Sequence, residues 1–70
     1  MSRAAIYAMA RAHKVTPIQL GWYAARAADK AGVLYKITGD SAQFAWTLTN
    51  SQLVAQEIAK GGCPHFGGAT

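Results

Sequence analysis

Acidic residues are scarce in this sequence, which has three of them against seven lysines and arginines in 70 residues. The resulting net charge of +4 excludes an acidic surface that mimics DNA, and it suits nucleic acid, an anionic membrane or an acidic protein face as partner. The single cysteine, Cys63, excludes an intramolecular disulfide and fits a reducing compartment. No apolar run approaches the roughly 18 residues of a membrane-spanning helix. We therefore expect one small cytoplasmic domain that does not enter a membrane.

Large apolar residues are also few, because Leu, Ile, Val and Phe number 13 together whereas Ala alone numbers 15. A core built from them is light, and a domain of this size is marginally stable without further support. A catalytic site needs at least two groups with tuned protonation, and three acids and two histidines offer little material for one. Four ligands at the spacing of a structural zinc site are absent from the sequence. We expect no enzyme, no metal and no cofactor.

The charge is distributed unevenly along the chain. Residues 1–36 contain six of the seven basic residues and one acid, a net charge of +5, whereas residues 37–70 carry a net charge of −1. Such asymmetry in a small domain indicates that one face meets an anion. The alternative is that these charges serve solubility alone.

Three helices are predicted from propensity and capping signals. The first spans Ser2 to about His13, the second Pro17 to about Ala31, and the last Ser51 to about Lys60. Thr16 followed by Pro17 is a strong helix start, because Thr provides a capping oxygen and Pro loses no needed donor at the first helical position. Small residues form a narrow apolar stripe on the second helix, namely Leu20, Ala24, Ala27, Ala28 and Ala31. Residues 1–60 are expected to form the domain, and the glycine-rich residues 61–70 a flexible tail.

Two runs between the second and last helices have the composition of strands. Residues 33–37 are β-branched and aromatic, and residues 44–49 alternate large apolar with small or polar side chains. The link between them, residues 38–43, is rich in turn formers. These features predict an antiparallel hairpin, with Phe44 and Trp46 in the core.

Residues 8–49 resemble a winged helix-turn-helix domain. The resemblance rests on small Ala10 in the first helix, Val15 after the turn, the Thr16-Pro17 cap and Leu20 facing back from the second helix. It extends to the passage from Ala31-Gly32 into the first strand, and to the Leu48-Thr49 end of the second strand. The resemblance implies an α+β fold in the order helix, helix, hairpin, helix. Lys14 occupies a turn position often filled by glycine, so it is expected in the left-handed conformation.

For function, the resemblance implies a small DNA-binding regulator of the type found in prokaryotes, phages and mobile elements. It would act by occupancy, with residues 17–31 as the helix that enters the major groove. The residues expected to contact double-stranded DNA are Lys14, Thr16, Gln19, Trp22, Arg26, Lys30 and Lys36. Gln19 would read adenine and Arg26 guanine or phosphate, whereas the lysines would neutralise phosphates. The Thr16 hydroxyl and the helix N-terminus would bind a phosphate directly.

The main alternative is a winged-helix-like module that binds another protein, as an adaptor or a phage-type inhibitor. The Trp22-Tyr23 pair favours it, because exposed aromatic pairs are typical of protein interfaces. The predicted wing link also carries Asp40 and no basic residue. The same pair would face DNA under the main interpretation, or the core if the helix were rotated. Since the helix that usually precedes this motif is missing, the last helix or a second subunit must cover the core, and we expect a homodimer.

Overall fold

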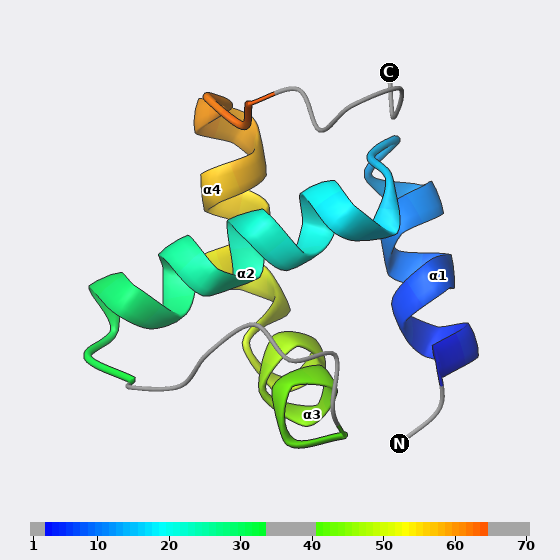
Figure 1. Ribbon diagram of the computed structural model, residues 1–70, viewed down its shortest axis with the longest axis horizontal. Coiled ribbons are helices and arrows are strands. Elements are labelled where there is room, and N and C mark those ends of the chain that lie inside the picture. Colours follow the sequence, from blue (N-terminus) through cyan, green and yellow to red (C-terminus); the bar gives the residue numbers. More distant parts are fainter. Residues whose placement is uncertain (1–2, 34–40, 65–70) are drawn as a thin grey trace.

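A computed structural model describes residues 3–33 and 41–64 of the chain. These residues form four helices, α1 (Arg3–Ala12), α2 (Pro17–Lys30), α3 (Ser41–Thr49) and α4 (Ser51–Lys60). Helix α2 runs across the molecule and α4 crosses it, while α1 lies steeply inclined at the N-terminal end of α2 (Figure 1). No strand occurs within the described residues, so the predicted α+β winged fold is wrong.

The error lies at residues 44–49, which were predicted to be a strand and instead belong to α3. Their alternation is also compatible with a helix, because Phe44 and Leu48 lie four residues apart and both pack against the core. Gln43 and Thr47, at the same spacing, are buried, and the Thr47 hydroxyl donates to the Gln43 carbonyl at 2.8 Å. Short apolar runs do not distinguish the two structures by period alone. Of the other predicted strand, residues 33–37, all but Val33 lie outside the described residues.

The three helices predicted from capping signals are confirmed. Thr16 forms a full capping box at the start of α2, and Gly32 follows its end with a φ of 78°. Helix α4 ends at Lys60, as predicted, and Gly61 follows as its C-cap. Asn50 precedes α4 but its side chain does not cap it; it donates instead to the Trp46 carbonyl, in the last turn of α3, at 3.0 Å.

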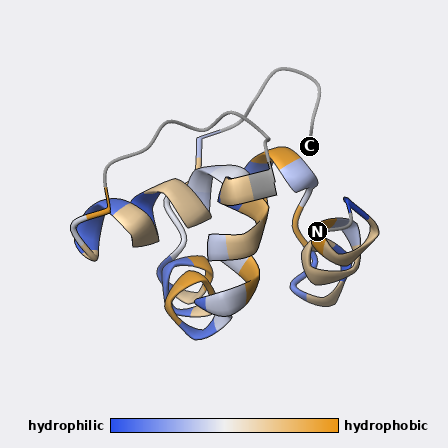
Figure 2. Cartoon of the chain, turned by 90° about the horizontal axis from the view of Figure 1, so that it is seen from below, coloured by the Kyte–Doolittle hydropathy of each residue, from blue (hydrophilic) through white to orange (hydrophobic). Residues whose placement is uncertain are grey.

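The core lies where α2 packs on α4, the most extensive contact between helices. The stripe of small residues on α2 lets α4 approach closely, and all of it except Ala31 is buried. Leu20 and Val54 are the largest fully buried side chains. Hydrophobic and hydrophilic residues alternate along each helical ribbon, as expected for helices with one buried side (Figure 2). Helix α4 thus provides the cover that was expected from the last helix or a second subunit.

A tight four-residue connection joins α1 to α2. The Val15 amide donates to the Ala10 carbonyl at 3.0 Å, and the Lys14 amide donates to the Arg11 carbonyl at 3.1 Å. Lys14 has a φ of 59°, which confirms the left-handed conformation expected there. Ala10 is buried beneath the crossing, consistent with the need for a small residue. Among the described residues, no helix has the length and apolar character required to cross a membrane.

Candidate nucleic-acid interface

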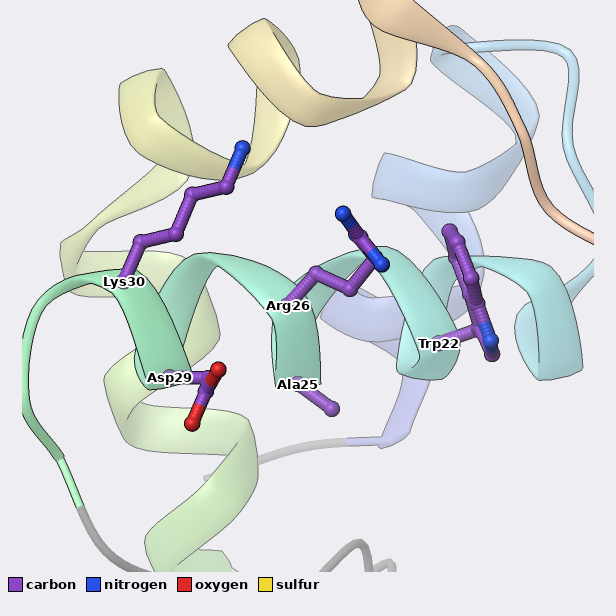
Figure 3. Close-up of a pocket in the computed structure, with 5 residues that line it drawn as sticks. All are labelled: Trp22, Ala25, Arg26, Asp29 and Lys30. Carbon is purple, nitrogen blue, oxygen red and sulfur yellow. The ribbon is translucent and has the colours of Figure 1, made fainter.

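The side of α2 that faces away from the core is the surface expected to meet DNA. Its most exposed apolar side chain is Ile18, at 58% exposure. Arg26, Asp29 and Lys30 are also exposed, and Trp22 is half-buried. Trp22, Arg26, Asp29 and Lys30, with Ala25, line an open hollow of about 320 Å³ on this side (Figure 3). The predicted recognition face therefore exists as a surface, and it combines two cations with an acid and apolar side chains.

Trp22 and Tyr23 do not form a shared exposed pair. The two rings meet edge to face with centroids 5.2 Å apart, but Tyr23 is buried in the core. The Trp22 ring also lies 5.1 Å from the Arg26 guanidinium carbon, a cation–π contact. Of the aromatic pair predicted as a protein-binding surface, only Trp22 is available to a partner.

Arg26 and Lys30 extend from α2 toward Glu57 on α4, a residue that the sequence interpretation did not single out. Lys30 Nζ lies 3.0 and 2.9 Å from the two Glu57 carboxylate oxygens. Arg26 Nε lies 3.7 Å from Oε1, and Lys60 Nζ lies 3.5 Å from Oε2. Glu57 itself is 5% exposed. Three cations thus surround one carboxylate, and we call these four residues the Glu57 cluster.

The electrostatics of the Glu57 cluster follow from these distances. Hydrogen bonds from Lys30 hold the pKa of Glu57 below its ordinary value, against the opposing effect of burial. The same hydrogen bonds raise the pKa of Lys30. The sequence does contain a signal for this residue. Glu57 lies three positions after Val54, on the apolar side of α4, where an unpaired carboxylate would be costly.

Thr16 and Gln19 lie at the other end of α2 and bond to each other. The backbone N–H of Gln19 donates to Thr16 Oγ1 at 3.1 Å, and the backbone N–H of Thr16 donates to the side-chain oxygen Oε1 of Gln19 at 2.9 Å. Bidentate reading of adenine requires both the oxygen and the nitrogen of a glutamine side chain. The capping box engages the oxygen, so reading of adenine by Gln19 would use the remaining lone pair of Oε1 or require the side chain to leave the cap. The Thr16 hydroxyl accepts in the cap, which leaves its own proton available for donation.

The predicted contact residues therefore fall into two groups at opposite ends of α2. Lys14, Thr16 and Gln19 lie at its start, and Lys14 is exposed. Arg26 and Lys30 lie about 10–20 Å further along the helix axis, with Trp22 between the groups. Lys36 lies outside the described residues.

Comparison of the chain with known protein families, curated proteins and solved structures finds no match.

Proposed function

We propose that this protein binds double-stranded DNA through a helix-turn-helix formed by α1 and α2, and that it acts by occupancy as a small cytoplasmic regulator. The supporting observation is the α1–α2 connection. A four-residue turn with Lys14 in the left-handed conformation, above buried Ala10, resembles the turn of helix-turn-helix proteins, where glycine is frequent. The proposal needs no wing.

The charges of the described residues support the start of α2 as the main phosphate contact. Lys14 is exposed and forms no ion pair within the described part of the chain. The amides of the first turn of α2 carry the positive end of the helix dipole. Arg26 and Lys30, on α2 itself, add positive charge to this helix. These groups would provide the salt-dependent part of the affinity.

The exposed side chains of α2 would provide the sequence-dependent part. Arg26 is half-exposed, and its guanidinium is oriented by the Trp22 ring. Ile18, near the start of the helix, suits the methyl group of thymine. One such helix reads a single half-site, so we propose that a homodimer binds two half-sites one helical turn apart. Sedimentation equilibrium in the presence of a duplex tests that stoichiometry.

The test compares two variants that each remove one positive charge, measured by anisotropy with a labelled mixed-sequence duplex at several salt concentrations. Lys14→Gly suits the φ of 59°, so the turn is retained. Lys60→Gln is the control, because Lys60 lies on α4 away from the turn. We expect the salt slope to fall by about one for Lys14→Gly and to change less for Lys60→Gln. Absence of binding by folded wild-type protein at low salt, or equal effects of both variants, would contradict the proposal.

A protein-binding role for the same face is the second candidate, and exposed Ile18 favours it. An apolar side chain at 58% exposure, about one helical turn before Trp22, is suited to a partner protein. The Ile18→Gln substitution separates the two functions. It leaves non-specific duplex affinity within about twofold if DNA is held through phosphates, and it abolishes capture of a protein partner if the partner covers Ile18.

A further inference from the structure

Glu57 contacts the two cations of α2 at different distances. Lys30 donates to both carboxylate oxygens of Glu57, at 3.0 and 2.9 Å. Arg26 approaches the same carboxylate through Nε at 3.7 Å, which is beyond hydrogen-bond distance. The Arg26 guanidinium also lies over the Trp22 ring, 5.1 Å from its centre. The carboxylate therefore holds the lysine closely and the arginine loosely.

The contact with Glu57 also sets the direction of the Lys30 side chain. Figure 3 shows Lys30 extending from α2 toward α4, whereas the Asp29 side chain points to the opposite side. Glu57 is 5% exposed, so water competes little for its carboxylate. The pKa of Glu57 is held below its ordinary value, which keeps the carboxylate ionised at neutral pH. The ammonium group of Lys30 is thereby drawn away from the side of α2 that is proposed to meet DNA.

We infer that Glu57 is a specificity-determining residue, which competes with DNA phosphates for Lys30 and leaves Arg26 able to contact a base. This inference rests on the proposed function. A lysine ammonium is a point charge, which binds a phosphate whatever the sequence. An arginine guanidinium is a planar fork that matches O6 and N7 of guanine. A carboxylate that holds the lysine more closely than the arginine therefore lowers non-specific affinity more than specific affinity.

The competition follows from the same contact that stabilises the fold. Lys30 lies in the last turn of α2, where the helix dipole favours a cation, and it pairs a buried acid. A phosphate can bind Lys30 only if Glu57 loses its closest partner, which is costly for a buried carboxylate. Lys14 is exposed and takes part in none of the ion pairs between described residues, so it binds a phosphate without that cost. The two lysines should therefore differ in their effect on DNA affinity.

The test is a double-mutant cycle on Lys30 and Glu57, with affinity for a labelled mixed-sequence duplex measured by anisotropy at several salt concentrations. Glu57→Gln should raise the salt slope by about one, because Lys30 becomes available to a phosphate. Lys30→Gln should lower the slope by clearly less than one in the wild-type background and by about one in the Glu57→Gln background. Net charge alone predicts the same effect of Lys30→Gln in both backgrounds, and that result would overturn the inference.

Gln56→Lys is the matched control for net charge. It adds one positive charge at an exposed position of α4, so its net charge equals that of Glu57→Gln. Its slope should stay close to that of wild type, and a rise equal to that of Glu57→Gln would overturn the inference. If circular dichroism shows that Glu57→Gln is unfolded, Lys30→Gln in the wild-type background decides. A loss of slope as large as that of Lys14→Gly would then overturn the inference, and a clearly smaller loss would support it.

The outcomes separate this inference from the proposed function. If folded wild-type protein does not bind a duplex at low salt, both fail. If wild type binds and Lys14→Gly lowers the slope, but Lys30→Gln has the same effect with and without Glu57, the inference fails and the proposed function stands. Specificity is measured on a duplex obtained by site selection with wild type. Glu57→Gln should reduce the ratio of its affinities for the selected and mixed-sequence duplexes several-fold, and an unchanged ratio would contradict the assigned role of Glu57.

Discussion

Lys30 on α2 donates to both carboxylate oxygens of Glu57 on α4, at 3.0 and 2.9 Å. The two residues are 27 positions apart, and their contact joins the two helices that form most of the core. Glu57 is buried while Lys30 remains half-exposed, so water screens the lysine more than the carboxylate. The pair therefore orients the α2 cations and also satisfies a buried acid.

Replacement of Glu57 by Gln should destabilise the protein. The amide cannot neutralise Arg26, Lys30 and Lys60, which would then repel one another at the crossing of α2 and α4. We expect the Tm to fall by several degrees in a thermal melt followed by circular dichroism. Gln56→Ala, at the preceding exposed position, is the control and should melt close to wild type. An unchanged melt for Glu57→Gln would show that the cluster does not stabilise the fold.

Stability should also decrease as the solution is acidified. The pKa of Glu57 is lower in the folded state than its ordinary value, so its stabilising effect is complete above that value and is lost as the pH falls through the folded-state pKa. Urea unfolding below about pH 4.5 should give a decreasing free energy of unfolding in wild type. The decrease should be smaller in Glu57→Gln. Equal pH dependence of the two proteins would assign the effect to other carboxylates.

Two leucines provide a matched test of the core. Leu20 on α2 is 1% exposed, whereas Leu53 on α4 is 39% exposed. Leu20→Ala should reduce the free energy of unfolding by about 2–5 kcal/mol, which is enough to unfold a marginal domain of this size. Leu53→Ala should change it by about 0.5 kcal/mol or less. Chemical denaturation of both variants measures these free energies of unfolding. Similar losses of stability in the two variants would mean that Leu20 is not at the centre of the core.

Loss of the Thr16 hydroxyl should weaken the start of α2. In Thr16→Ala the backbone N–H of Gln19 loses its capping acceptor, which should lower the free energy of unfolding by about 1 kcal/mol. Thr16→Ser should retain the cap and most of the stability. Thr49→Ala, at an exposed position at the end of α3, is the control for loss of a threonine hydroxyl. A stable Thr16→Ala protein would indicate that water replaces the cap.

Local signals predicted the elements that depend on neighbouring residues. The Thr16-Pro17 start, the glycines after α2 and α4 and the left-handed Lys14 were all predictable, because each follows from backbone geometry within a few positions. Residues 44–49 were predicted wrongly, because an alternating run of six residues satisfies a strand and a helix equally. Their packing on α1 and α4 is a tertiary contact, and it favours the helix.

The sequence by itself determined the boundaries of α2 and α4, the small residue at Ala10 and the concentration of positive charge before residue 37. Only the tertiary structure decided that Tyr23 turns inward and that Glu57 lies among three cations. The reason is physical. Capping and helix propensity act over one turn of chain, whereas the burial of a side chain and the pairing of Lys30 with Glu57 depend on how α4 crosses α2.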